Sequence, residues 1–247
     1  MKHYEPLMSF GEEEAEIYDT EPDVSQRADT AATVALLAGL AGDGPALELA
    51  IGTGRVALPL AARGIRVDGV DFSAAMVARL RAKPGGDQIA VTMGNFADVP
   101  VQGSYRLIYI VFNTLFNLLT QDEQVRCFEN VAAHLTDDGV FVVEAATPNQ
   151  LMRLRNDQYV DAEALAVNEV RLDVGRYDAV TQRLEESHVV LSAEGVRVHP
   201  IVTRYAWPSE LDLMARIAGL RLQERWGGWN REPFTSASDN QVAVYGR

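Results

Sequence analysis

The stretch from 46 to 73, "ALELAIGTGRVALPLAARGIRVDGVDFS", constrains the fold most strongly. It predicts an apolar strand over 46–50, a glycine turn, a helix over 55–63 and a second strand over 65–70 that ends at Asp71. A glycine turn that opens a helix exposes backbone N–H groups, and an acid after the second strand can accept hydrogen bonds from a ribose. The stretch therefore predicts a nucleotide-binding unit, but it does not say which nucleotide is bound.

Strands and helices go on alternating after this unit. The pattern predicts a helix over 73–82 with Ser73 as its N-cap, strands over 89–93 and 106–112, a helix from the Thr120–Glu123 capping box to about 135, and a strand over 140–145. A further helix, over 23–40 with Asp23 or Ser25 as its cap, is expected before the first strand. Such alternation predicts an α/β fold: a Rossmann-like, doubly wound, mostly parallel seven-stranded sheet with helices on both faces.

The pattern changes after Pro148. Three strand-like runs lie between 165 and 205, with turns expected at 175–178 and 193–195, which predicts an inserted antiparallel three-stranded cap. A helix over 208–218 and two final strands return to the main sheet. We therefore expect an N-terminal arm or lid over 1–22, a nucleotide-binding core over 23–148 and 206–247, and the cap over 149–205.

The formal charge of −13, from 22 basic and 35 acidic residues, disfavours nucleic-acid and membrane partners. The one cysteine, Cys127, has no disulfide partner and is expected to be a buried helix residue. The acidic N-terminal stretch lacks an apolar signal region, and no apolar run is long enough for a membrane span. These features are typical of a cytoplasmic protein, and the cap offers a place for self-association into a homo-oligomer.

Two nucleotides fit the turn equally well at first. "GTGRVA" matches the G-x-G-x-x-A pattern of nicotinamide dinucleotide enzymes, and Asp71 would serve either ligand. Glu48, four residues before Gly52, favours a donor with a cationic amino group over a pyrophosphate. Asn95, after the third strand, could accept a hydrogen bond from an adenine amino group. The turn has no lysine, which excludes a P-loop.

With these residues the chain resembles the class I S-adenosylmethionine (SAM)-dependent methyltransferases, over about 15–148 and the last two strands. The family pattern acid-x-Gly-x-Gly-x-Gly stands here as Glu48-Leu-Ala50-Ile-Gly52-Thr-Gly54, so alanine replaces the first glycine. Asp71 matches the family's ribose acid, and Asn95 replaces its acidic adenine contact. The resemblance implies SAM as methyl donor, S-adenosylhomocysteine as product, no metal, and these donor contacts: Tyr18, Glu48, Ala50, Gly52, Gly54, Asp71, Phe72, Met76, Asn95, Phe96, Val111 and Phe112.

The cap resembles that of small-molecule N-methyltransferases, including those acting on amino sugars of natural products. The stretch "EIYDTE" resembles the family's arm over the sulfonium, which makes Tyr18 a candidate catalytic residue. The second candidate is Phe116, which follows the fourth strand. The acceptor is expected to approach along the ends of the fourth and fifth strands. Its candidate contacts are Tyr4, Phe10, Asn113, Phe116, Asn117, His188 and Trp229.

Methyl transfer from a sulfonium needs alignment of acceptor, carbon and sulfur, and a hydroxyl acceptor usually needs a base or a metal as well. The sequence offers no evident His–Asp pair near the ends of the fourth and fifth strands and no carboxylate cluster for magnesium. This favours an amine of a natural product or amino sugar as acceptor. Methylation of oxygen or carbon, a nicotinamide oxidoreductase and a non-catalytic SAM-binding protein remain alternatives.

Overall fold

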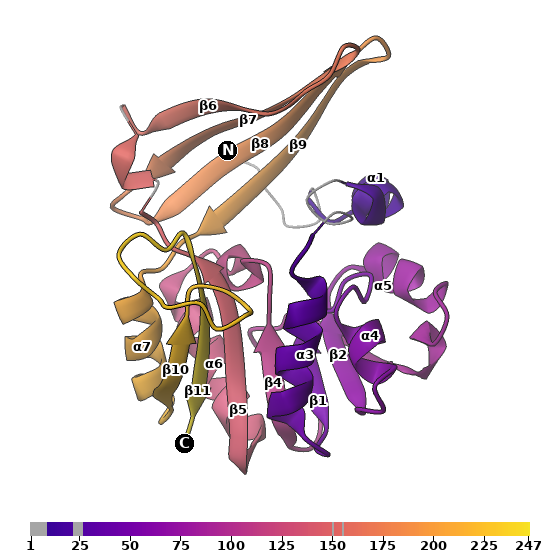
Figure 1. Cartoon of the computed structure of the whole chain (residues 1–247), viewed down its shortest axis with the longest axis vertical. Coiled ribbons are helices and arrows are strands. Elements are labelled where there is room, and N and C mark those ends of the chain that lie inside the picture. Colours follow the sequence, from indigo (N-terminus) through magenta and orange to yellow (C-terminus); the bar gives the residue numbers. More distant parts are fainter. Residues whose placement is uncertain (1–8, 22–26, 150, 155) are drawn as a thin grey trace.

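A computed structural model describes residues 9–21, 27–149, 151–154 and 156–247 of the chain. Its two sheets differ in size and position (Figure 1). A seven-stranded sheet with helices on both faces forms the body, and a four-stranded antiparallel sheet lies across the carboxyl ends of its central strands. The predicted Rossmann-like fold is confirmed.

The order of strands in the large sheet is β10-β11-β5-β4-β1-β2-β3. The five strands from β3 to β5 run parallel, while β11 is antiparallel to both of its neighbours. The chain order reverses between β1 and β4, and ligands of such sheets bind at this point outside the carboxyl ends of the strands. The strands are β1 Ala46–Leu49, β2 Val67–Asp71, β3 Ala90–Met93, β4 Tyr105–Ile110, β5 Leu135–Ala146, β10 Arg221–Trp226 and β11 Asn240–Gly246.

Two apolar clusters cover the two faces of this sheet. One includes residues of α3, α4 and the loop that carries Trp229; the other includes residues of α6 and α7. Cys127 lies fully buried in the second cluster, as predicted. The helices of the body are α3 Thr30–Ala41, α4 Ala57–Ala61, α5 Ala74–Arg81, α6 Gln121–His134 and α7 Pro208–Ile217, with short 3₁₀ helices η3 Gly86–Gln88, η4 Thr114–Asn117 and η5 Leu151–Arg153.

The helix-start signals of the sequence were more reliable in the middle of the chain than at its beginning. Ser73 caps α5 by accepting a hydrogen bond from the Met76 N–H at 3.3 Å, and the Thr120–Glu123 capping box opens α6. The helix expected over 23–40 begins only at Thr30, and its expected caps Asp23 and Ser25 lie outside the described residues. Residues 9–21 of the expected arm contain α1 Glu12–Ile17 and η2 Tyr18–Thr20.

The cap has four strands, so the prediction of three was wrong. They are β6 Gln158–Leu165, β7 Glu169–Asp178, β8 Arg183–Ser192 and β9 Gly195–Arg204, paired in that order. The turn expected at 175–178 lies inside β7 because Gly175 serves a close approach instead: a Cβ there would lie 2.5 Å from Cε1 of Tyr159. The turn at 193–195 is confirmed, since β9 starts at Gly195.

Among the helices of the described residues, none is both long enough and apolar enough to cross a membrane.

Candidate functional site

The glycine turn after β1 has open space beside Gly52 and close packing beside Gly54. Ala50, Gly52 and Gly54 all have positive φ, of 54°, 56° and 80°. A Cβ added to Gly52 would meet nothing within 4 Å, whereas one added to Gly54 would lie 2.3 Å from Cδ1 of Leu80. Gly52 therefore leaves room for a ligand, while Gly54 allows helix packing. Ala50, which stands at the place of the first glycine in the family pattern, has a left-handed conformation, at a cost of about 1 kcal/mol.

Asp71 connects this turn to the end of β2. Its carboxylate accepts hydrogen bonds from the Gly52 N–H at 2.7 Å and from the Ser73 N–H at 2.8 Å. Burial raises the pKa of Asp71, and these N–H donors act in the opposite direction. A carboxylate can accept about four hydrogen bonds, so capacity remains for the two hydroxyls of a ribose.

Glu48 lies behind the turn and not on the surface of the cavity. The residue is 3% exposed, and its carboxyl accepts a hydrogen bond from the Tyr109 hydroxyl at 3.0 Å. Burial raises the pKa of Glu48 to about 8. The Glu48 side chain therefore packs behind the turn and does not contact the cavity.

The ends of β4 and β5 are held together by buried polar contacts. Phe112 and Asn113 both have left-handed backbone, with φ of 60° and 59°. The Phe112 N–H donates to Oε2 of Glu144 at 2.7 Å, and Glu144 also pairs with Arg27, whose guanidinium lies 4.7 Å from the centroid of the Phe112 ring. The side-chain oxygen of Asn113 accepts from the Ala146 N–H. These contacts fix the floor of the cavity.

The segment 9–21 forms a side wall between the body and the cap. Asp19 accepts a hydrogen bond from the Thr53 hydroxyl at 2.6 Å, and it forms an ion pair with Lys83. On the cap side, Glu14 lies 3.1 Å from Nδ1 of His199, and Glu21 pairs with two arginines of the cap. The arm therefore makes polar contacts with both the body and the cap.

A cavity of about 870 Å³ lies between the sheet ends, this side wall and the cap. It is large enough for a nucleotide-sized donor together with a small acceptor. Thirteen of the predicted site residues line it: Phe10, Tyr18, Ala50, Gly52, Asp71, Phe72, Met76, Phe96, Phe112, Asn113, Phe116, Asn117 and His188.

Five other predicted site residues, all of them described by the structure, do not line this cavity. Glu48 and Gly54 lie behind the turn, and Val111 is buried in the core. Asn95 is exposed, and its side-chain oxygen accepts from the Ala97 N–H at 2.9 Å. Trp229, expected to contact the acceptor, is 5% exposed and belongs to the apolar cluster that includes residues of α3, so we withdraw it. Tyr4 lies outside the described residues.

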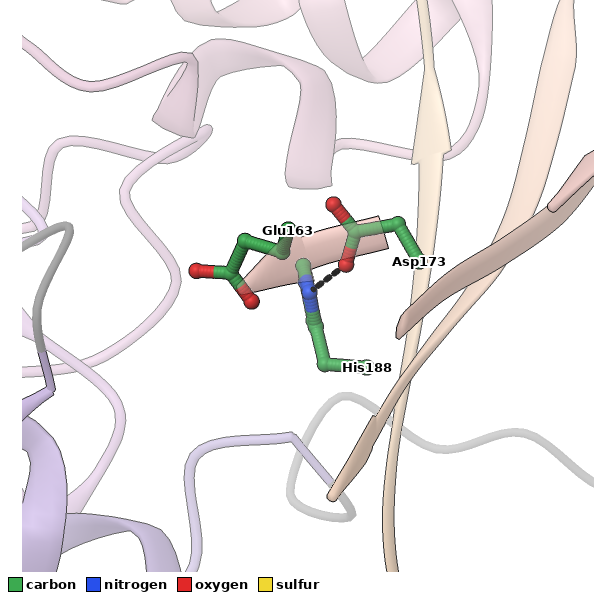
Figure 2. A group of neighbouring side chains, drawn as sticks. All are labelled: Glu163, Asp173 and His188. Carbon is green, nitrogen blue, oxygen red and sulfur yellow. Dashed lines mark hydrogen bonds and ion pairs between the residues drawn. The ribbon is translucent and has the colours of Figure 1, made fainter. Parts of the chain in front are cut away.

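The cap contributes acidic residues that the sequence analysis missed. Oδ1 of Asp173 lies 2.6 Å from Nδ1 of His188. Glu163 completes a group of three residues in which one carboxylate oxygen or ring nitrogen of each lies within 4.8 Å of those of the others (Figure 2). The sequence showed no such pair or cluster, because these residues come from three different strands. The only sequence signal was the alternation of Glu186 and His188 along one strand.

Comparisons with known proteins agree with this geometry. A family model described as a methyltransferase domain matches residues 46–139. The CcbJ methyltransferase of Streptomyces caelestis is 38% identical, with a TM-score of 0.90, over 96% of this chain and 97% of that one. A cypemycin N-terminal methyltransferase of a Streptomyces species is 26% identical over 201 residues, which is 81% of this chain and 82% of that protein. An amino pentose methyltransferase of Micromonospora echinaspora shares the fold, with 21% identity and a TM-score of 0.68 over 99% of this chain and 100% of that one.

The open glycine turn, the buried acid after β2 and the strand order define a nucleotide-binding α/β protein of the Rossmann-like class. The likeness to the CcbJ methyltransferase over nearly the whole chain narrows this class. The chain belongs to the class I SAM-dependent methyltransferases. This decides the choice between a dinucleotide and a methyl donor that the turn alone left open.

Proposed function

We propose that this enzyme transfers a methyl group from SAM to an amine nitrogen of a small molecule, such as an amino sugar or a related natural product. The observation that carries the proposal is the charge of the cavity wall. Eight acidic residues line it against two arginines, and both arginines pair with Glu21. The acids are Glu14, Glu21, Asp71, Asp161, Glu163, Asp173, Glu186 and Asp239. Such a wall favours a cationic acceptor over an anionic one.

The names of two relatives support nitrogen as the acceptor atom. One relative is described as an N-terminal methyltransferase and another as an amino pentose methyltransferase. Both descriptions involve amine-bearing acceptors, although the acceptors themselves differ. Methylation of oxygen or carbon is kept as an outcome of the test below.

We propose the following roles for the chain's own residues. Asp71 would accept hydrogen bonds from the ribose, and the open backbone at Gly52 would admit the donor closely. Phe72, Met76 and Phe96 offer apolar contacts for the adenine. The donor supplies an electrophilic methyl carbon on a sulfonium. Tyr18 and Phe116 would border the path of the incoming nitrogen and keep water away from it.

The test uses SAM labelled with ¹³C at its methyl group and a set of matched acceptors. Amino sugars, short peptides with a free N-terminus and simple alkylamines would be compared with their hydroxyl counterparts, and NMR would locate the label. The proposal expects label on nitrogen. Label only on oxygen or carbon would overturn the choice of acceptor atom. Binding of S-adenosylhomocysteine without transfer to any acceptor would indicate a non-catalytic protein.

A further inference from the structure

A histidine and an aspartate of the cap face the cavity as a hydrogen-bonded pair. Asp173 on β7 lies directly opposite His188 on β8, which lies opposite His199 on β9. Oδ1 of Asp173 lies 2.6 Å from Nδ1 of His188 (Figure 2). A carboxylate can only accept, so Nδ1 carries a proton, and Nε2 is the nitrogen at which the ring gains or loses its second proton.

The groups around this pair favour a positive charge on His188. On its own strand, Glu186 places Oε1 3.4 Å from Nε2 of His188. Glu163 reaches the pair from β6, and Asp161 of the same strand lines the same cavity. Burial raises the pKa of Glu186, while the neighbouring His188 acts to lower it.

The nearby basic groups do not oppose that charge. The ring of His199 stacks on that of His188, with centroids 6.1 Å apart. Burial lowers the pKa of His199 to about 4, so His199 is neutral near pH 7. Arg171 and Arg197 are both paired with Glu21 of the side wall. In the part of the chain that the structure describes, the two arginines that line the cavity with the pair are therefore matched by carboxylates, Arg171 by Glu21 and Glu169 and Arg197 by Glu21.

An amine acceptor needs such a base because its protonated form has no lone pair. An alkylamine with a pKa near that of lysine is about 99.9% protonated at pH 7. A positioned imidazole has a pKa close to the working pH, and general bases of this kind contribute roughly 10²–10⁴ in rate. The sequence analysis favoured an amine because it found no base, whereas the structure places one in the cavity that would make an amine reactive.

We propose that His188, held by Asp173, removes the proton from the acceptor's ammonium group before methyl transfer. This inference rests on the proposed N-methylation. The ammonium N–H bond breaks, and its proton moves to Nε2 of His188. The freed lone pair then forms the N–C bond while the C–S bond breaks, and its electron pair stays on sulfur as a neutral thioether. His188 afterwards releases its proton to water.

The test compares His188→Gln and Asp173→Asn with the wild type from about pH 6 to pH 10, with the best alkylamine acceptor of the panel above. Removing a general base is expected to lower kcat/KM of His188→Gln about 100-fold at pH 7. The loss should shrink towards zero as the pH approaches the pKa of the amine, because the acceptor then arrives deprotonated. Asp173→Asn should lose less, roughly tenfold.

The matched control is Glu185→Gln, which removes a carboxylate from the same strand as His188. Glu185 points to the other face of the cap and pairs with Arg176 at 2.7 Å. It should keep the wild-type pH profile, and all variants should bind S-adenosylhomocysteine as the wild type does. A loss in His188→Gln that stays constant across the pH range would mean a packing role and overturn the proposal. An unchanged kcat/KM would overturn it as well.

A second measurement does not depend on the acceptor. Nitrogen-15 NMR of the histidine rings should show neutral His188 with its proton on Nδ1, and Asp173→Asn should change that tautomer. A proton on Nε2 would contradict the proposal. So would a tight stoichiometric site for Zn²⁺ that is lost in His188→Gln and raises turnover, because the pair would then be a metal ligand. If the wild type methylates only oxygen or carbon, the proposed function fails; if it methylates nitrogen and His188→Gln is normal, only this inference fails.

Discussion

The two halves of the cavity are built in different ways. The donor corner, formed by the turn 50–54 with Asp71, consists largely of backbone, and its acid is already hydrogen-bonded to two N–H groups. The cap wall, formed by the inward faces of β6 to β9, combines apolar side chains with charged ones that are mostly half-buried. We therefore infer that the donor corner binds the methyl donor, while the cap wall determines which acceptor binds. We thus expect a substitution in one half to leave the affinity for the ligand of the other half unchanged.

The largest effect is expected for Asp71→Ala. Losing two hydrogen bonds to a carboxylate is expected to cost about 3 kcal/mol, which weakens binding of S-adenosylhomocysteine roughly 100-fold. Calorimetry would measure this, with Asp43→Ala as control because that aspartate lies exposed on the loop before β1. Unchanged affinity in a folded Asp71→Ala protein would show that the donor corner is misassigned.

A pH-dependent effect on stability is expected for Glu48→Gln. Glu48 keeps its proton up to about pH 8 in the folded protein, whereas the unfolded chain ionises it near 4.5. Its contribution to stability is thus fully present below pH 4.5 and is lost as the pH rises through 8. Glutamine does not titrate, so the free energy of unfolding of Glu48→Gln should gain about 2 kcal/mol relative to wild type between pH 6 and pH 8. Urea unfolding at both pH values measures this, and an equal difference at both would refute the buried, protonated Glu48.

A smaller effect, confined to the acceptor, is expected for Glu186→Gln. Removing one carboxylate from the cap wall should raise KM for a cationic acceptor about tenfold, or roughly 1.4 kcal/mol, with donor affinity unchanged. Steady-state kinetics with a charged amine and with an uncharged analogue would separate charge from shape. An equal loss for both acceptors would contradict a wall that selects by charge.

The smallest effect is expected for Ala50→Gly. Glycine adopts the left-handed conformation of this position without strain, so stability should rise by up to about 1 kcal/mol and the melting temperature by roughly 2–4 °C. The affinity for the donor should stay the same, because Ala50 packs against the apolar cluster that includes residues of α6 and α7. A marked change in affinity would indicate that the alanine methyl group itself touches the donor.

The sequence predicted the donor corner well because its signals are local. Strand, turn, helix and acid lie within 28 consecutive residues, and each follows from a local pattern of apolar and glycine residues. Ser73 and the Thr120 capping box are local in the same sense, and both were confirmed. Glu48 was the exception, because its burial under Tyr109 depends on a strand that lies 61 residues away.

The cap wall could not be predicted because it depends on strand register. Reading Gly175 as a turn would have placed Asp173 at the end of a strand, away from His188. Only the packing of Gly175 against Tyr159, a contact between two strands, shows that β7 continues. Trp229 was misjudged for a similar reason, since the indole folds back into the core between the last two strands.

Three sequence-based expectations stay predictions: the division of the chain at 22, 148 and 205, the cytoplasmic location, and self-association through the cap. Several apolar side chains on the outer face of the cap are exposed, among them Val160, Val196 and Val198. Sedimentation of the purified protein would test the last of these.

The most direct test of the central claim is a competition between two acceptors that differ only in carrying an amine or a hydroxyl group at the same carbon. With saturating SAM and equal acceptor concentrations near pH 7, we predict that methyl transfer to the amine is at least about 100-fold faster. Only the amine is cationic, so only this acceptor is attracted by the acidic wall and needs the general base that the cap provides. Equal rates, or faster transfer to the hydroxyl compound, would contradict the proposal that the enzyme methylates an amine nitrogen.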